Sequence, residues 1–175
     1  MAKTYYVSAG LIIGGPGVLT FTGSVVLVGS QAGLRLGDGT NIRLTGSGHA
    51  SMLEMTTKAY RNCRVEHITF MCNTSPALDV YPAERGLYIS DTSFYGHLFD
   101  DLSFYNARTT IEIAYGVSAN GEFCTFSNVR GFYAQTYFKM SGTAGQSFGH
   151  MFYGGAHLAI ESLQGSPYYL SLIHI

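Results

Sequence analysis

Five side chains that could do acid–base or ion-binding chemistry occupy the same place in a short recurring motif. Each is the middle residue of a triplet whose neighbours are mostly apolar, as in Leu53-Glu54-Met55 and Ile111-Glu112-Ile113. The five residues are Glu54, Asp79, Glu112, Lys139 and Glu161. Carboxylates that face one another can share a proton, bind a cation, or act as acid and base on a glycosidic bond. This chemistry requires an element that brings distant residues together.

A second motif precedes the first in each repeat and carries further candidates. It starts at Val65, Phe99, Phe126 and Phe148, and the triplets that follow it start at Leu78, Ile111, Phe138 and Ile160. The two motifs are 13, 12, 12 and 12 residues apart, whereas the repeat itself restarts after 34, 27 and 22 residues. Constant spacing within units of variable length indicates strands that stack in register while the turns absorb insertions. Alternation of apolar and polar residues indicates strands with one buried face.

These patterns predict the columns of side chains that stacked coils would form. The interior columns would read Val65, Phe99, Phe126, Phe148 and Leu78, Ile111, Phe138, Ile160. The outward columns would read Glu54, Asp79, Glu112, Lys139, Glu161; Glu66, Asp100, Ser127, Gly149; and His67, Asp101, Asn128, His150. Because successive strand residues face opposite ways, either Asp100 or Asp101 must point inward or lie on a bulge. Segment 82–98 is interpreted as an insertion, although 87–94 is strand-like.

Composition supports an all-β fold in a single domain. The chain has 175 residues, of which 46% are hydrophobic, 12% are charged and 22 are glycine. No window shows the spacing of an amphipathic helix. We therefore expect a β-helix domain over residues 1–167 and a non-native or truncated tail over 168–175, with further coils missing beyond it.

Charge and cysteine content exclude several functional classes. The net charge of −1 and the lack of a basic stripe argue against nucleic acid as a partner. No apolar run is long enough to span a membrane as a helix. The short N-terminal apolar run ends in the turn Gly14-Gly15-Pro16-Gly17, which argues against a secretory signal. Cys63 and Cys124 fall in one column about 10 Å apart, too far for a disulfide.

The segment Gly15–Gly48 carries a resemblance to a known fold family. Its Leu34-x-Leu36 and Ile42-x-Leu44-x-Gly46-x-Gly48 runs, with the coils after Asn62, resemble the opening of the pectate-lyase superfamily and of phage tailspikes. The resemblance implies a single-stranded right-handed parallel β-helix of about six coils. It also implies a polysaccharide-binding, and in some members polysaccharide-degrading, protein on a virion or outside the cell, often a homotrimer.

Several functions remain open under this resemblance. Asp79, Glu112, Glu161, Asp101 and His150 are the candidate catalytic residues of a glycoside hydrolase or polysaccharide lyase. Asp100-Asp101 and Gly149-His150 resemble elements of polygalacturonases, but the expected aspartate after Asn73-Thr74 is replaced by Ser75 and no Arg-x-Lys follows. A lyase would use calcium and an arginine base, for which Arg108 and Arg130 are available; otherwise no cofactor or metal is expected. The alternative is a non-catalytic structural or receptor-binding spike, whose acidic column is a solvated stripe bridged by Lys139.

Tyrosines at the turns are candidates for sugar stacking. Their rings could lie against the apolar faces of sugars, or simply pack the turns. The candidates are Tyr81, Tyr105, Tyr115, Tyr133, Tyr137 and Tyr153. Tyr81, Tyr115 and Lys139 are the predicted substrate-binding residues.

Overall fold

All regular elements of the described part of the chain are parallel strands. The computed structural model describes residues 3–7, 11–13, 20–21, 26–29, 39–55, 62–72, 80–90, 94–115, 119–142, 145–148 and 150–158. Every regular element in these ranges is a β-strand, and every strand pairing is parallel, so the prediction of an all-β chain is confirmed. The described ranges hold no helix that could cross a bilayer. The expected strand Leu34–Leu36 and the tail 168–175 lie outside them.

The strands form three sheets. The nine-stranded sheet contains β1 (Lys3–Val7), β4 (Val26–Val28), β5 (Thr40–Leu44), β7 (Arg64–Cys72), β10 (Leu98–Tyr105), β13 (Thr125–Ser127), β14 (Arg130–Phe132), β17 (Met151–Tyr153) and β18 (Ala156–Leu158). The six-stranded sheet contains β2 (Leu11–Ile13), β3 (Thr20–Phe21), β6 (His49–Met55), β8 (Ala83–Ser90), β11 (Ala107–Tyr115) and β15 (Thr136–Gly142). The three-stranded sheet contains β9 (Phe94–Tyr95), β12 (Ala119–Glu122) and β16 (Gly145–Phe148).

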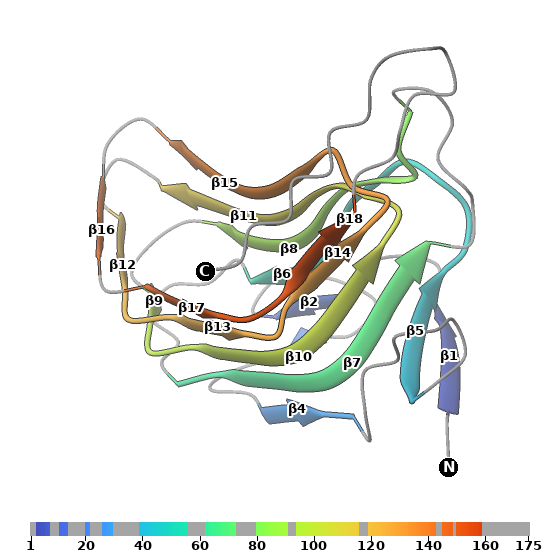
Figure 1. Cartoon of the computed structure of the whole chain (residues 1–175), viewed down its shortest axis with the longest axis horizontal. Coiled ribbons are helices and arrows are strands. Elements are labelled where there is room, and N and C mark those ends of the chain that lie inside the picture. Colours follow the sequence, from blue (N-terminus) through green and yellow to red (C-terminus); the bar gives the residue numbers. More distant parts are fainter. Residues whose placement is uncertain are drawn as a thin grey trace.

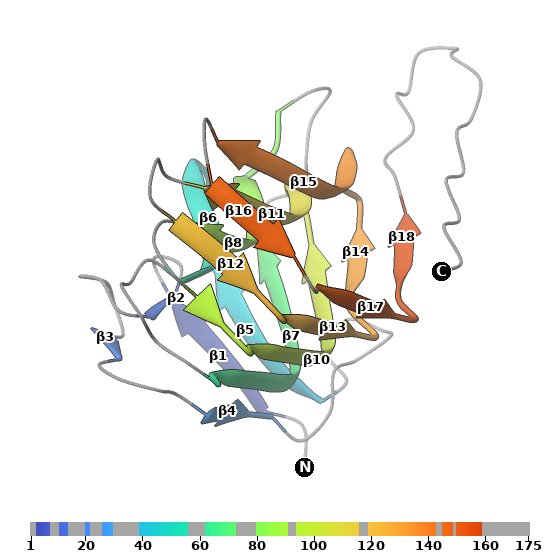
Figure 2. The ribbon, with the colours of Figure 1, turned by 90° about the vertical axis from the view of Figure 1, so that its left-hand side faces the viewer.

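From β7 onward the chain visits the sheets in a fixed order. It passes from the nine-stranded to the six-stranded and then to the three-stranded sheet through β7, β8 and β9, and repeats this order through β10, β11 and β12. The next passage runs through β13 and β14, then β15 and β16, before the chain returns to β17 and β18. Figure 1 shows the six-stranded sheet above the nine-stranded one, with the three-stranded sheet closing one side. Figure 2 shows like strands of successive passages side by side.

Aromatic rings stack in the space between the sheets. The rings of Phe99 and Phe126 lie 5.3 Å apart and nearly parallel at 13°, and Phe126 lies 4.8 Å from Phe152 at 12°. Val65 pairs with Phe99, which extends this column to β7. A second stack, of Phe70 and Phe104 at 5.2 Å, lies farther along β7 and β10. The predicted interior column is therefore confirmed for Val65, Phe99 and Phe126.

The sequence predicts Phe148 as the fourth member of that column, but in the structure the fourth member is Phe152. Phe126 pairs with Phe152, whereas Phe148 pairs with Glu122 in the three-stranded sheet. The motif that starts at Phe148 has a similar sequence, but it lies four residues before the residue that aligns with Phe126. The backbone shows the reason, because the left-handed residue Asn128 is matched by Gly154, two residues after Phe152.

The second interior column needs a similar correction. Leu53 pairs with Leu87, Leu87 with Ile111, and Ile111 with Phe138. Leu87 thus occupies the place predicted for Leu78, and the strand β8 lies within the supposed insertion 82–98. Since the chain is longer between β7 and β8 than the 13-residue spacing predicted for this repeat, the apolar triplet that aligns with Ile111-Glu112-Ile113 is Leu87-Tyr88-Ile89.

Corners between strands are made by residues with left-handed backbone geometry. At the corner within the nine-stranded sheet these are His67 (φ 58°), Asp101 (φ 48°), Asn128 (φ 50°) and Gly154 (φ 60°). The left-handed residue at this corner allows Asp100 and Asp101 to follow one another without either becoming buried. The predicted bulge is not present, because Asp100 pairs with Glu66 and Leu102 with Ile68, so both strands turn at the same position. A second corner uses Asn62, Gly96 and Phe123, and a third uses Asn106 and Tyr133.

Candidate functional site

Glu112 is the most strongly engaged of the predicted site residues. It lies on β11 with only 5% of its surface exposed. Arg85 Nε lies 2.8 Å from Oε2, while Lys139 Nζ at 3.2 Å and the Ser141 hydroxyl at 2.7 Å reach Oε1. Arg85 comes from β8, and Lys139 and Ser141 come from β15, so the carboxylate links three neighbouring strands of the six-stranded sheet. We call Arg85, Tyr88, Glu112, Lys139 and Ser141 the Glu112 cluster.

Electrostatics keep the Glu112 carboxylate ionised. Burial alone raises its pKa, but the hydrogen bonds from Ser141, Arg85 and Lys139 and the charge of Arg85 outweigh burial, so the pKa is lowered from its ordinary value. A carboxyl group with a lowered pKa is a poor general acid at neutral pH, because it has no proton to donate. The cluster therefore suits an electrostatic anchor better than a proton donor.

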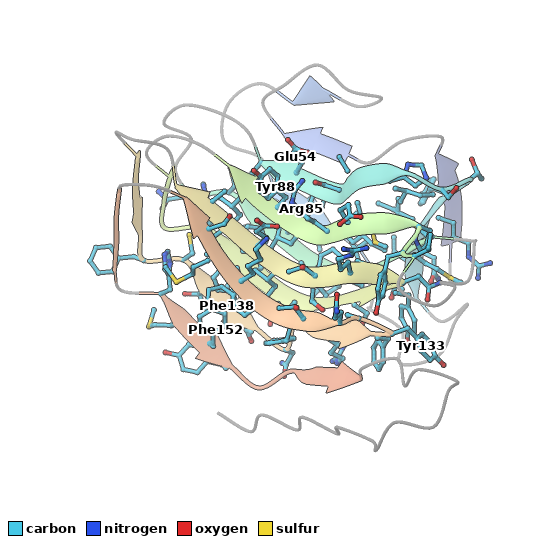
Figure 3. The ribbon with its side chains drawn as sticks, turned by 90° about the horizontal axis from the view of Figure 1, so that it is seen from above. Glu54, Arg85, Tyr88, Tyr133, Phe138 and Phe152 are labelled. Atoms are coloured by element: carbon cyan, nitrogen blue, oxygen red, sulfur yellow. The ribbon has the colours of Figure 1, made fainter. Side chains whose placement is uncertain are left out.

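The outward column of the six-stranded sheet differs from the predicted one. Glu54, Tyr88 and Arg85 lie near one another on the six-stranded sheet (Figure 3). Tyr88 pairs with Glu54 on one side and with Glu112 on the other, and Glu112 pairs with Lys139. Tyr88 thus takes the place predicted for Asp79, and the guanidinium carbon of Arg85 lies 4.0 Å from the centre of its ring. Lys139 contacts Glu112 as predicted, but Glu112 is buried and not part of a solvated stripe. Asp79 and Glu161 lie outside the described residues.

Asp101 is the centre of a second polar group, at the corner of the nine-stranded sheet. Its Oδ2 lies 3.1 Å from His67 Nδ1, and its Oδ1 lies 2.7 Å from Arg130 Nη2. Arg130 also donates from Nη1 to the Ser103 hydroxyl at 3.3 Å. His67, Asp101, Ser103 and Arg130 form what we call the Asp101 cluster, which connects β7, β10 and β14. Its carboxylate is balanced by a guanidinium from the next passage of the chain.

His150 is not on this outer face, where the sequence places it. It directly precedes Met151, which pairs with Thr125, so it aligns with Cys124 and not with Asp101 or Asn128. Its Nδ1 accepts a hydrogen bond from the Cys124 amide at 3.2 Å, and its ring lies edge-on to Phe126. Burial lowers its pKa. The predicted column is therefore wrong at His150, because the repeat restarts four residues later than the motif at Phe148 suggests.

Three aromatic side chains gather at one corner beside the Asp101 cluster. The ring of Tyr105 stacks on that of Phe132 at 4.4 Å and is tilted toward that of Tyr133 at 6.5 Å. Tyr105 and Phe132 pair across β10 and β14, and Tyr133 is 44% exposed at the turn that follows. Figure 3 places Tyr133 at a corner far from Glu54 and Tyr88. We call Tyr105, Phe132 and Tyr133 the aromatic corner.

The remaining predicted tyrosines have different surroundings. Tyr81 is partly buried, and the centre of its ring lies 5.6 Å from the guanidinium carbon of Arg108. Arg108 also pairs with Glu84. Tyr137 donates its hydroxyl to the Val129 carbonyl at 2.8 Å, and burial raises its pKa to about 12. Tyr153 is exposed on β17. Tyr115 lies at the end of β11, and its side chain is outside the described part of the structure.

Sequence reasoning missed several partners in both polar clusters. Arg85, Tyr88 and Ser141, which contact or flank Glu112, were not predicted, nor was the contact of Arg130 with Asp101. The predicted column does place His67 next to Asp101. A signal for Ser141 was present, because it follows Lys139 by two residues and so lies on the same side of β15. No comparable signal existed for Arg85, since β8 was interpreted as part of an insertion.

Within the described residues, no three His, Cys, Asp or Glu side chains are arranged to hold a metal ion. The three cysteines, all buried, are free thiols, as predicted. No known family model, curated protein or solved structure is significantly similar to this chain.

Proposed function

We propose that the chain is a right-handed parallel β-helix of about six coils, of the type found in pectate lyases and phage tailspikes, and that it binds a polysaccharide. The architecture is supported by parallel strands that return to the same three sheets in the same order. Columns of apolar side chains in register, such as Phe99, Phe126 and Phe152, are what coils stacked along one axis require.

The observation that carries the binding proposal is the adjacency of the aromatic corner and the Asp101 cluster. Arg130 and Phe132 are two residues apart on β14, and Ser103 and Tyr105 are two apart on β10, so each pair projects from the same side of its strand. The intervening Gly131 faces Thr110 on the interior side. Polar groups therefore lie about 7 Å from stacked aromatic rings along the strands.

This combination matches the chemistry of a sugar. The apolar face of a pyranose ring packs against an aromatic side chain, and its hydroxyl groups need hydrogen-bond donors and acceptors nearby. Tyr133 offers the exposed ring, while the partly exposed imidazole of His67 and the Asp101 carboxylate offer hydrogen-bonding atoms. A chain of sugars could then extend across neighbouring coils, since like strands of successive passages lie side by side (Figure 2).

Tyr133→Ala tests the binding site directly. We expect retention of the wild-type chain by at least one member of a panel of bacterial capsular polysaccharides, O-antigens and polygalacturonate in affinity electrophoresis. Loss of one stacking ring should weaken binding about 10-fold, which corresponds to about 1.4 kcal/mol. Phe123→Ala is the matched control, because Phe123 is similarly exposed, at 43%, on a different corner. Equal binding by Tyr133→Ala and Phe123→Ala would contradict this location of the site.

A second candidate is a non-catalytic receptor-binding spike, and the ion pairs of Glu112 and Asp101 favour it over an enzyme. Both carboxylates accept from cationic side chains, which opposes the protonated state that a glycosidase acid needs. Reducing-end release from the bound polysaccharide distinguishes the two. A spike releases none, whereas an enzyme releases sugar at a rate that falls in Asp101→Asn or Glu112→Gln variants.

The proposed setting follows from the same resemblance. Tailspikes act on the virion and pectate lyases outside the cell, and tailspikes are homotrimers, so we propose an extracellular or virion location and a trimeric assembly. Calcium would be needed only by a lyase. Light scattering of the purified chain measures the assembly, and a monomeric mass would contradict the trimer.

A further inference from the structure

Cysteine and histidine alternate at the corner where the chain enters the nine-stranded sheet. Leu98 pairs with Arg64 and with Thr125, and Thr125 pairs with Met151. The residues directly before these four, Cys63, His97, Cys124 and His150, therefore occupy equivalent places on successive strands. We call them the histidine–cysteine column.

The two histidines form the same hydrogen bond to the preceding strand. His97 Nδ1 accepts from the Cys63 amide at 3.1 Å, and His150 Nδ1 accepts from the Cys124 amide at 3.2 Å. In the same column, Leu98 N–H donates to the Cys63 carbonyl and Met151 N–H donates to the Cys124 carbonyl, both at 2.9 Å. Each histidine thus adds a side-chain bond beside the backbone ladder, and it does so in its neutral form, with the proton on Nε2.

The surroundings of these rings are apolar. His97 is 2% exposed, and its ring meets Phe99 edge-on at 6.3 Å, the same distance that separates His150 from Phe126. Burial lowers the pKa of His97 to about 4 and also lowers the pKa of His150. The thiol of Cys124 stays protonated, because burial raises its pKa to about 12.

Several charged side chains near this corner form ion pairs with one another. On β7, Arg64 pairs with Glu66. On β10, Asp100 is partly exposed and Asp101 is held by His67 and Arg130. Burial lowers the pKa of both His97 and His150, because an apolar site penalises the charged form of each ring.

We propose that His97 and His150 form an acid-sensitive latch that holds successive strands together at this corner at neutral pH and releases it in acid. Protonation turns Nδ1 from an acceptor into a donor, so Nδ1–H would then face the amide of Cys63 or Cys124. The hydrogen bond is lost, and the charged ring lies in an apolar site.

Linkage gives the direction and the pH window. The folded-state pKa of His97 is lowered, so its contribution to stability is complete above the unfolded pKa of about 6.5 and is lost as pH falls toward 4. As pH falls from 8 to 5, protonation of His97 alone is expected to raise the unfolding equilibrium constant about 30-fold. His150, which is less buried, adds a smaller effect in the same direction.

The test compares wild type with His97→Asn. The asparagine side-chain oxygen takes the position of Nδ1 and can accept the Cys63 amide hydrogen bond, but it does not titrate. Amide hydrogen exchange of the full-length chain, corrected for intrinsic rates, should show protection at Cys63 falling at least 10-fold from pH 7 to pH 4.5 relative to Ile111 in wild type. In His97→Asn this relative protection should not change with pH. His49→Asn, at a histidine that contacts Thr45 in an exposed turn, should behave as wild type.

A second readout does not depend on the variant folding. Nitrogen NMR of the wild-type imidazoles should show His97 with an unprotonated Nδ1 at pH 7 and a titration midpoint well below 6. A midpoint near 6.5, or a Cys63 amide whose protection falls equally in wild type and His97→Asn, would overturn the proposal.

Discussion

Glu112 illustrates how neighbouring side chains keep a buried carboxylate ionised. Its two oxygens are shared among a guanidinium, an ammonium group and a hydroxyl from two flanking strands. These donors replace the water that burial removes, and they outweigh the cost of burying the charge. Asp101 repeats the arrangement on another sheet with His67 and Arg130. In both places a carboxylate connects adjacent strands.

Glu112→Gln tests this role. Because the folded-state pKa of Glu112 is lowered, its stabilisation is present above the ordinary value of about 4.3 and is lost as pH falls below it. We expect the variant to lower the free energy of unfolding at pH 7 by about 1–3 kcal/mol. The variant should also lose less stability than wild type between pH 5 and pH 3.

Urea unfolding at pH 7, 5 and 3 measures both effects. Glu54→Gln is the control, since Glu54 lies in the same column, next to Tyr88, but is more exposed. It should change the free energy of unfolding by less than about 0.5 kcal/mol. If wild type and Glu112→Gln lost the same free energy of unfolding between pH 5 and pH 3, the ion pairs of Glu112 would not stabilise the fold.

The sequence predicts part of the site for a clear reason. Period-two alternation identifies Glu112 and Lys139 as outward residues of equivalent strands, and their contact follows. The prediction that Asp79 lies beside Glu112 is wrong, because Tyr88 occupies that position. Apolar triplets start at both Leu78 and Leu87, and the sequence does not indicate which of them enters the six-stranded sheet after β7. Arg85 approaches Glu112 across strands, which no spacing in a single sequence encodes.

At the scale of the elements, stacked phenylalanines hold the nine-stranded sheet in register. Phe126 is the centre of the stack, with Phe99 on one side and Phe152 on the other. Phe152 also meets Phe138 edge-on at 4.9 Å, which joins β17 to β15 of the six-stranded sheet. The short strand β13, only three residues long, depends on this burial because it has few hydrogen bonds of its own.

Phe126→Ala should therefore be strongly destabilising. Removing a buried phenylalanine costs about 3–5 kcal/mol, and here both neighbouring rings lose a stacking partner. Denaturant unfolding followed by circular dichroism measures the loss. Phe123→Ala, at an exposed corner three residues earlier, should cost less than about 1 kcal/mol. Similar losses in the two variants would mean that Phe126 is not in the interior.

Element boundaries were predictable where the motif was unambiguous. The triplet Leu53-Glu54-Met55 lies in a strand as predicted, because alternation and glycine turns define it, although its partner is Leu87-Tyr88-Ile89 and not the triplet at Leu78. The start of the last repeat was not predictable from the apolar pattern, since Phe148 and Phe152 both begin suitable motifs. Gly154 decides between them, because it aligns with the left-handed Asp101 and Asn128, where the chain must turn.

At the scale of the whole molecule, one rule explains both the successes and the errors. The strands keep a constant register across successive passages, while the connections between them vary in length. Outward positions of distant segments are therefore brought onto one surface, which is how the aromatic corner and the Asp101 cluster become neighbours. The proposed binding surface and the proposed latch both depend on this register.

The most direct test of that register is the ring-to-ring NOE pattern of Phe126 in a sample with selectively labelled phenylalanine. The structure predicts contacts from Phe126 to Phe99 and to Phe152, with centroid distances of 5.3 Å and 4.8 Å. Cross-peaks between Phe126 and Phe148, without any to Phe152, would contradict it.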